Sequence, residues 1–383
     1  MSPHGFEVKE FLVERWMNTY ENDALFNLAE TDAKPFTLEE LLSFGNKEGH
    51  WQDLLSMKLA YNPTLGSDRL RRLIASQYEG VLPEEVLVTT GAIEANFLLA
   101  SALVKPGDTV IVQSPAYQAL YSVAEARGAK IKHWRMKLED NYVPDMDVLE
   151  GLIDERTRAV VVNVPHNPTG AVLGQEKLQK LIAWAEEKDF WIICDEVYHD
   201  IELEKDVLAS KARSLSPKAI SVGSFSKSFG LSGLRLGWFA ANPELVEQCW
   251  SWKDYTSISI SPLNDYLACL ALENREEIMH KNIALAQMNL EALMQWFEEQ
   301  KKHIEYVLPK AGLLTFPRFR DLPISTEQFC LGLFEKEKVL LMPGECFDHP
   351  GYLRIGYGND HEVFTRGLDM VAKHVRQVYD KGR

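Results

Sequence analysis

Short runs of β-branched and apolar residues alternate with longer helical patterns between residues 85 and 195. The strand-like runs are Val86–Thr90, Thr109–Gln113, Ala159–Asn163 and Phe190–Cys194. Because the runs are rich in apolar residues over their whole length, the strands are expected to be buried on both faces. This rhythm predicts an α/β fold in which helices cover a mostly parallel sheet.

The pattern changes after residue 243. The expected helices there span 244–252, 263–274 and 276–302, and strand-like pieces follow at 313–316, 339–342 and 352–356. We therefore predict a large domain over residues 46–262 and a smaller α+β domain over 263–383. The first 45 residues lack the βα rhythm and are expected to pack with the smaller domain or over the site.

Charge and hydropathy limit the classes of function. The net charge is -15, and no basic cluster of the kind that binds nucleic acid is present. No apolar run approaches the roughly 20 residues that span a bilayer, and the N-terminus lacks the apolar core of a signal peptide. The five cysteines are scattered without CxxC spacing, which favours reduced thiols over disulfides or a metal site. A cytoplasmic protein without a metal is expected.

The segment from Ser224 to Trp238, SFSKSFGLSGLRLGW, combines a lysine, several hydroxyls and an arginine. It closely resembles the lysine motif of the class I/II aminotransferases, which are fold type I, aspartate-aminotransferase-like enzymes that use pyridoxal 5′-phosphate (PLP). A lysine can form an imine with the cofactor aldehyde, while hydroxyls and an arginine neutralise its phosphate. The resemblance implies that Lys227 carries PLP as a Schiff base and that Ser224, Ser226 and Arg235 bind the cofactor. It also implies a seven-stranded sheet.

Two further motifs follow strands, where open α/β sheets place their ligand crevice. Asp195 ends one strand, and the family resemblance implies that it pairs with the pyridine nitrogen of PLP. Tyr198 and Asn167, from the segments DEVY and NPTG, match residues that bond the phenolic oxygen of PLP. Taken alone, these segments would also suit a helix start and a Pro-Gly turn.

The loop TGAIEAN joins a strand to a helix, so its backbone N–H groups form a phosphate site. Gly91, Ala92 and Ile93 are therefore expected to bind the cofactor, although many relatives carry Ser or Thr where Ile93 stands. By resemblance, Tyr117 stacks on the pyridine ring. Tyr61 matches a tyrosine that reaches the phosphate of a neighbouring subunit, which implies a homodimer with shared active sites.

Arg354, in the segment YLRIG, resembles the arginine that binds the substrate α-carboxylate, with Asn167 beside it. The planar guanidinium suits a carboxylate because it can make two parallel hydrogen bonds. Together the motifs imply an aminotransferase that acts on an L-α-amino acid and a 2-oxo acid, with Lys227, Asp195 and Tyr198 as catalytic residues.

Other outcomes stay open, because fold and motif alone do not select a reaction. The alternatives are β- or γ-elimination, or cyclisation or oxidation of an arginine-like substrate, as in capreomycidine-synthase-like proteins. Glu30 and Asp32 could favour a cationic side chain, or could be solvated residues near the capping box Thr37–Glu40. A non-enzymatic regulator is disfavoured, since Lys227, Asp195 and Arg354 are all present and no helix-turn-helix segment precedes Met1.

Overall fold

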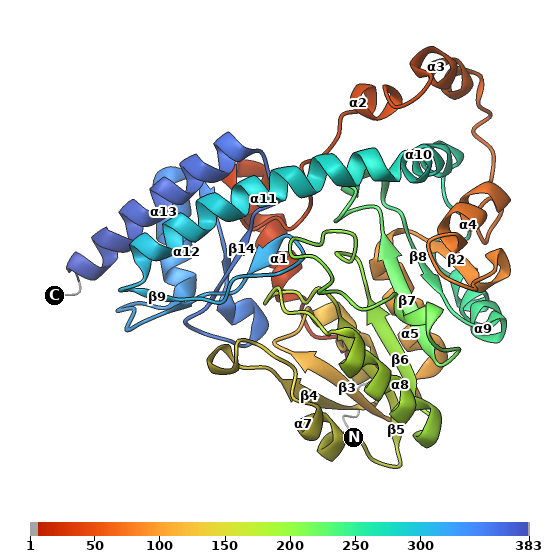
Figure 1. Cartoon of the computed structure of the whole chain (residues 1–383), viewed down its shortest axis with the longest axis horizontal. Coiled ribbons are helices and arrows are strands. Elements are labelled where there is room, and N and C mark those ends of the chain that lie inside the picture. Colours follow the sequence, from red (N-terminus) through yellow and green to blue (C-terminus); the bar gives the residue numbers. More distant parts are fainter. Residues whose placement is uncertain (1–6, 382–383) are drawn as a thin grey trace.

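The computed structural model describes residues 7–381. Its larger lobe is built on a seven-stranded sheet in the order β2-β8-β7-β6-β5-β3-β4, which confirms the predicted sheet (Figure 1). The strands in that order are β2 Val86–Thr89, β8 Gly237–Ala240, β7 Ala219–Ser224, β6 Trp191–Asp195, β5 Thr157–Asn163, β3 Thr109–Ser114 and β4 Lys130–Arg135. Within this sheet β8 alone runs antiparallel to its neighbours.

Helices cover both faces of the sheet, as the apolar strands require. On one face Leu98 and Leu245, from α5 Gly91–Leu103 and α9 Pro243–Lys253, join a cluster with the strands. On the other face Leu149 and Leu181 do the same. The remaining helices of this lobe are α4 Asp68–Ala75, α6 Ser122–Ala126, α7 Met146–Leu152 and α8 Gln175–Lys188.

The chain after residue 260 forms long helices and short strands, most of which make up the second lobe. Its helices are α11 Arg275–Gln300, α12 Thr326–Glu337 and α13 His361–Lys381, whereas α10 Pro262–Glu273 packs against α4 of the large lobe. Its strands are β9 Ile304–Glu305, β10 Leu314–Thr315, β11 Arg318–Phe319, β12 Val339–Leu340, β13 Met342–Pro343 and β14 Leu353–Gly356. The expected strand at 339–342 is thus two short strands that belong to different sheets. The predicted domain boundaries themselves stay a prediction.

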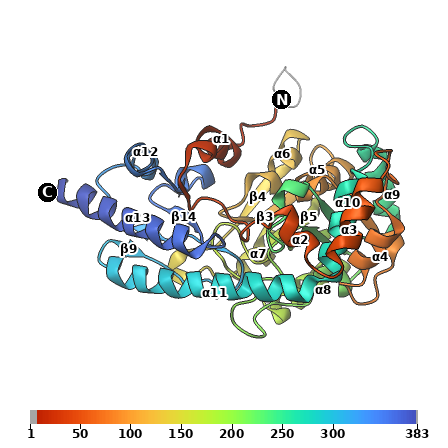
Figure 2. The same ribbon diagram turned by 90° about the horizontal axis from the view of Figure 1, so that it is seen from above.

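Helix α11 runs from the large lobe to the far end of the second lobe (Figures 1 and 2). Two asparagines on it reach both parts of the molecule. Asn282 Nδ2 donates to the carbonyl oxygen of Ser228 at 2.7 Å, and Asn289 Nδ2 donates to that of Tyr357 at 2.9 Å. The helix therefore contacts the loop after β7 and the chain after β14.

The N-terminal segment contains α1 Leu12–Tyr20, β1 Phe26–Asn27, α2 Leu38–Leu42 and α3 Lys47–Ser56. Its first part, α1 and β1, lies against the second lobe, whereas α2 packs on α10 at the other end of the molecule (Figure 1). Strand β1 pairs in parallel with β12, and Trp16 of α1 donates to the Leu341 carbonyl at 2.9 Å. The expected capping box is present, because Thr37 and Glu40 exchange hydrogen bonds at the start of α2. The Gly356 N–H donates to the Leu28 carbonyl at 2.8 Å, which places the connection between α1 and α2 beside β14.

The chain between β3 and β4 does not form one continuous helix. A 3-10 turn spans Gln118–Leu120 and α6 begins at Ser122, because Tyr121 adopts a non-helical conformation. The Gln118 side chain accepts the Leu12 N–H at 3.2 Å and donates to the Glu10 carbonyl at 2.7 Å. The turn therefore anchors the start of α1.

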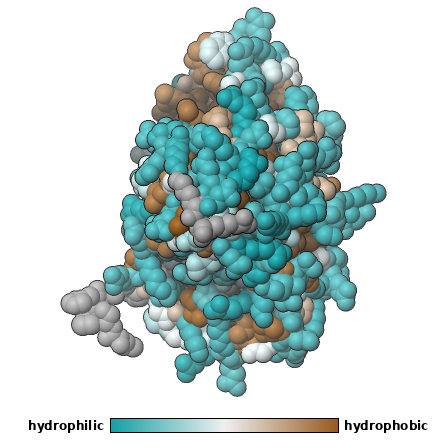
Figure 3. All heavy atoms as spheres, turned by 90° about the vertical axis from the view of Figure 1, so that its left-hand side faces the viewer, coloured by the Kyte–Doolittle hydropathy of each residue, from teal (hydrophilic) through white to brown (hydrophobic). Residues whose placement is uncertain are grey.

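The two ends of the molecule differ in surface character. Side chains on the face at the left of Figure 1 are mostly hydrophilic, with smaller hydrophobic areas between them (Figure 3). The segment around α3, at the opposite end, exposes large apolar side chains, namely Trp51, Leu55, Leu59 and Tyr61. Among residues 7–381, no helix combines the length and apolar character that crossing a membrane would need.

Candidate active site

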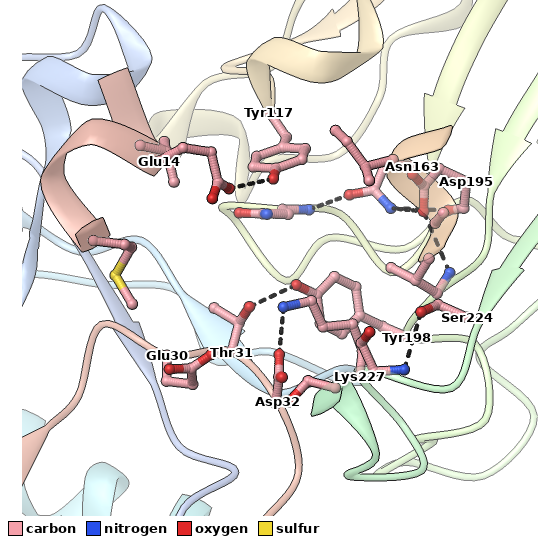
Figure 4. A pocket seen from close by; sticks show the side chains of 18 of the residues that line it. Glu14, Glu30, Thr31, Asp32, Tyr117, Asn163, Asp195, Tyr198, Ser224 and Lys227 are labelled. Carbon is pink, nitrogen blue, oxygen red and sulfur yellow. Dashed lines mark hydrogen bonds and ion pairs between the residues drawn. The ribbon is translucent and has the colours of Figure 1, made fainter. Parts of the chain in front are cut away.

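A cavity of about 490 Å³ lies where the carboxyl ends of the parallel strands meet α1, the chain at 29–32 and β14. Figure 4 shows side chains from α1, from the chain at 30–32 and from the strand ends pointing toward one another. Open α/β sheets bind ligands in this position because loops diverge from neighbouring strands there. The site is therefore assembled from both lobes and from the N-terminal segment.

Asp195, the last residue of β6, lies beside two amides. Asn96 Nδ2 donates to its Oδ2 at 3.2 Å, and Asn163 Nδ2 lies 3.3 Å from its Oδ1. The carboxyl group is buried, and this burial raises its pKa from 3.8 to about 6, against the opposing effect of the Asn96 hydrogen bond. A buried carboxylate held in this way is suited to bind a protonated ring nitrogen, because the new ion pair would offset its burial.

Lys227 follows β7, and its Nζ forms an ion pair with Asp32 (Figure 4). Next to this pair the hydroxyl groups of Thr31 and Tyr198 lie 2.8 Å apart in a hydrogen bond. The chain at 31–32 therefore contacts two of the predicted catalytic residues. Asp32 is 4% exposed and the Thr37 helix start lies beyond it, so the interpretation of Asp32 as a solvated helix-start residue is wrong.

The first turn of α5 forms the opposite end of the cavity. Thr90 at the N-cap makes no side-chain hydrogen bond to the helix, so no cap uses the first N–H groups. Gly91 has a φ of +72°, and a Cβ there would lie 2.9 Å from Arg235 Nη2. A Cβ at Gly237 would lie 2.4 Å from the Ala92 nitrogen. Gly91 and Gly237 thus allow the first N–H groups of α5 and the Arg235 guanidinium to lie close together. Such a group of donors suits a phosphate.

Arg354 is placed by β14 and is 3% exposed. One terminal nitrogen, Nη1, donates to Asn167 Oδ1 at 3.2 Å, and the other, Nη2, donates to the Ala29 carbonyl at 2.9 Å. Its buried Nε has no hydrogen-bond partner among the residues that the structure describes. A buried guanidinium with donor capacity left can bind a carboxylate.

Tyr117 lines the cavity, and its hydroxyl donates to Glu14 of α1 at 2.6 Å. Burial, followed by the charge of Glu14, holds the pKa of Tyr117 well above its ordinary value, so the phenol stays protonated and donates. Glu30 also lines the cavity, and burial together with repulsion from Asp32 raises its pKa. The α1 side of the cavity is therefore acidic.

The structure brings most of the predicted site residues together. The cavity is lined by Ala92, Ile93, Tyr117, Asn167, Asp195, Tyr198, Ser224, Ser226, Lys227, Arg235 and Arg354. Gly91 lies behind Ala92, against Arg235. Tyr61 is 88% exposed and lies outside this cavity. The roles of all these residues stay predictions.

Sequence reasoning gave no role to several residues at this cavity, among them Glu14, Glu21, Asn96 and Asn163. A signal for Asn163 existed, because it ends the strand next to that of Asp195 and pairs with it in register. Asn96 stands in the quoted loop motif, one turn into the helix. For Glu14 and Glu21 no motif in the neighbouring sequence indicated a place at the cavity.

The residues present fit PLP. Uncapped N–H groups with Arg235 and the buried hydroxyls of Ser224 and Ser226 suit its phosphate, Asp195 suits its ring nitrogen, and Lys227 suits its aldehyde. In the part of the chain that the structure describes, no cluster of three or more metal-ligating side chains occurs.

Comparison with known proteins identifies the family. Residues 31–371 match the family model "Aminotransferase class I and II". The chain is 30% identical to capreomycidine synthase from Streptomyces vinaceus, over 95% of this chain and 93% of that protein. Its fold matches that of a PLP-dependent aminotransferase from Streptococcus suis, with a TM-score of 0.92 and 34% identity over 97% and 99% of the two chains.

A second solved structure, the PLP-dependent cyclase OrfR, matches with a TM-score of 0.88 and 30% identity over 98% of this chain and 100% of that one. The family match covers most of the chain and includes the cavity residues from Thr31 to Arg354. The protein thus belongs to the class I and II aminotransferases, a family of fold type I enzymes with PLP as cofactor.

Proposed function

We propose that the protein is an aminotransferase that moves the amino group of an L-α-amino acid to a 2-oxo acid. The observation that carries this proposal is that Lys227, Asp195 and Arg354 line one cavity. One small molecule bound there can thus reach all three residues. Lys227 would hold the cofactor, Asp195 would keep its ring nitrogen protonated, and Arg354 would bind the substrate carboxylate.

When bound, PLP supplies an aldehyde that links to amines and a ring that accepts electrons from the substrate α-carbon. Lys227 provides the amine that holds the cofactor. After the substrate amine replaces it, the free Lys227 amine takes the proton from the substrate α-carbon and delivers it to C4′, the aldehyde carbon of the cofactor. Asp195 holds a proton on the ring nitrogen, with Asn96 and Asn163 fixing its orientation.

The other residues bind and orient. The α5 N–H groups, Ser224, Ser226 and Arg235 would hold the phosphate, and Tyr117 would lie against the ring. Tyr198 would donate to the phenolic oxygen. Asn167 can donate there as well, because its oxygen accepts from Arg354 and its amide N–H groups remain for other acceptors. Arg354 binds the α-carboxylate and so fixes which substrate bond faces Lys227.

An assay of product stoichiometry tests the proposal. The enzyme is loaded with PLP and given single amino acids without oxygen, with Lys227→Ala as control. Transamination requires one equivalent of 2-oxo acid per site without an acceptor and continued turnover only when another 2-oxo acid is added. Ammonia plus pyruvate without an acceptor would identify an elimination lyase instead. Activity in the Lys227→Ala control would contradict the role of Lys227.

A second candidate is cyclisation or oxidation of an arginine-like amino acid. Acidic side chains favour it, because Glu14, Glu21 and Glu30 line the cavity on the side of α1. With Asp32 and Asp195 they make five acidic lining residues against three basic ones among those described. The similarity to capreomycidine synthase points the same way. A ring-closed product without an equivalent of 2-oxo acid, or consumption of oxygen, would favour this candidate.

The proposal includes a homodimer in which Tyr61 contacts the cofactor of the second subunit. The exposure of Tyr61 together with Trp51, Leu55 and Leu59 supports it, since a contiguous exposed apolar segment is typical of an interface. Sedimentation of wild-type protein tests the dimer. In mixtures of inactive Lys227→Ala and Tyr61→Ala chains, hybrid dimers should restore activity. A monomer that retains full activity would contradict both parts.

A further inference from the structure

The chain at 30–33 is held in one position by its neighbours. A Cβ at Gly356 would lie 1.6 Å from the Glu30 carbonyl oxygen, and one at Gly358 would lie 2.2 Å from that of Asp32. From the other side, the Ala33 N–H donates to the Lys227 carbonyl at 2.9 Å. Two glycines of the second lobe and the Lys227 loop thus enclose this backbone. The Asp32 carboxylate therefore has little freedom to move.

Asp32 Oδ1 contacts the Lys227 nitrogen directly. The aspartate side chain is 3% exposed, whereas the Lys227 side chain keeps 28% of its surface on the cavity. An ion pair in this setting is strong because water cannot screen it from the aspartate side. The carboxylate is fixed, and the lysine is the partner that can turn toward a ligand.

Other ionisable groups also face the Lys227 nitrogen. They are Tyr198, Glu30 and, more weakly, Asp195. Burial opposes the charged form of the lysine, but Asp32 first, then Tyr198 and Glu30, outweigh burial and raise the pKa of Lys227. Asp32 is the group that adds a direct hydrogen bond to this effect.

We propose that Asp32 is the fixed counter-ion of the Lys227 nitrogen and keeps a proton on that nitrogen, both in the cofactor-free protein and while the lysine is linked to the cofactor. This inference rests on the proposed link between Lys227 and PLP. A proton on the nitrogen makes Lys227 a better leaving group when the substrate amine displaces it.

The exchange with the substrate needs no other proton acceptor. When a neutral substrate amine displaces Lys227, it gives one of its hydrogens to the lysine nitrogen. The lysine then leaves as a neutral amine that can act as a base. The positive charge passes to the substrate nitrogen, so no proton is gained or lost and no charge is created in a buried place.

A spectroscopic titration of the PLP-loaded protein tests the proposal without measuring activity. The visible absorption of lysine-linked PLP changes when the nitrogen loses its proton. Asp32→Asn keeps the shape and removes the charge, so the midpoint of this change should fall by about one pH unit or more. Glu30→Gln, which removes a carboxylate without direct contact, is the matched control and should shift the midpoint by less than half as much.

The possible results separate the inference from the proposed function. An Asp32→Asn midpoint within about 0.2 pH units of wild type would overturn the counter-ion role, because one unit corresponds to a tenfold change in the proton equilibrium. Absence of any lysine-linked absorption in wild-type protein, by contrast, would contradict the link between Lys227 and PLP. A midpoint that moves equally in both variants would show that the negative charge of the whole cavity, and not Asp32 in particular, holds the proton. That result would also overturn the counter-ion role.

A second measurement uses wild-type protein and so does not depend on the folding of a variant. PLP is added to cofactor-free protein, and the rate of covalent linkage is followed against pH. Since only a neutral amine reacts, the rate should still be rising at the ordinary lysine pKa of about 10.4. A plateau at lower pH would mean that Lys227 is not held as an ammonium ion, and the inference would be wrong.

Discussion

Asn163 and Asp195 stand opposite each other in the register of β5 and β6, and the Asn163 amide donates to the Asp195 backbone carbonyl at 2.8 Å. The same amide nitrogen lies 3.3 Å from Asp195 Oδ1. The asparagine thus joins the backbone and the side chain of the proposed ring-nitrogen partner. Its position at a strand end makes this arrangement rigid.

Asn163→Ala should therefore leave the Asp195 carboxylate in place but less firmly oriented. We expect weaker PLP binding by about tenfold, because a hydrogen bond to a charged group contributes about 1.5–3 kcal/mol. Equilibrium binding of PLP, followed by absorption, measures this change. Gln175→Ala, at the start of α8 outside the cavity, is a control that should leave PLP affinity unchanged. Unaltered binding in Asn163→Ala would contradict the orienting role.

The raised pKa of Asp195 predicts how stability depends on pH in the cofactor-free protein. Folded protein holds the proton up to about pH 6, whereas the unfolded chain releases it near 3.8. Stability should hence fall as pH rises between these values and stay lower above them. The loss corresponds to about 3 kcal/mol, at 1.36 kcal/mol for each pKa unit.

Asp195→Asn should remove this loss. At pH 7 the cofactor-free variant should melt at a higher temperature than wild type, and the difference should vanish below about pH 4. Thermal unfolding across this pH range provides the measurement. The same variant should bind PLP more weakly. A variant that is less stable than wild type at pH 7 would show that burial of the charged Asp195 carboxylate does not destabilise the cofactor-free protein.

Arg354→Lys should raise the KM for amino acids by about tenfold to a hundredfold, because the substrate carboxylate loses a two-point contact. PLP binding should change little. Steady-state kinetics with a fixed 2-oxo acid separates KM from kcat. Arg366→Lys, with a 58% exposed side chain on α13, serves as the matched control. A normal KM in Arg354→Lys would place the carboxylate elsewhere.

Glu14→Gln tests the acidic side of the cavity. If the substrate carries a cationic side chain, its KM should rise by about tenfold, while that of a neutral amino acid should be unchanged. Glu10→Gln is a suitable control, since its side chain is 65% exposed and pairs with Arg15. Competition assays with arginine and with a neutral amino acid give the comparison. Equal effects on both substrates would exclude charge recognition by Glu14.

The sequence was most informative where function follows local geometry. Buried strands predict the sheet, and a residue at a strand end, such as Asp195, lies near the ligand crevice of that sheet. Glu14 could not be found in this way, because its place depends on how α1 packs against Leu341 and Gln118, more than 100 residues away. Asp32 was noted, but its contact with Lys227 required the folded chain.

Helix α11 has a mechanical consequence for catalysis. Asn282 and Asn289, whose bonds hold the Lys227 loop and the chain after Arg354, are two turns apart on one continuous helix. A rise of 1.5 Å per residue makes their separation about 10 Å along its axis. The helix thus fixes the distance between the loop that carries Lys227 and the chain that follows Arg354. A closing motion of the second lobe must bend α11 or break one of these two hydrogen bonds.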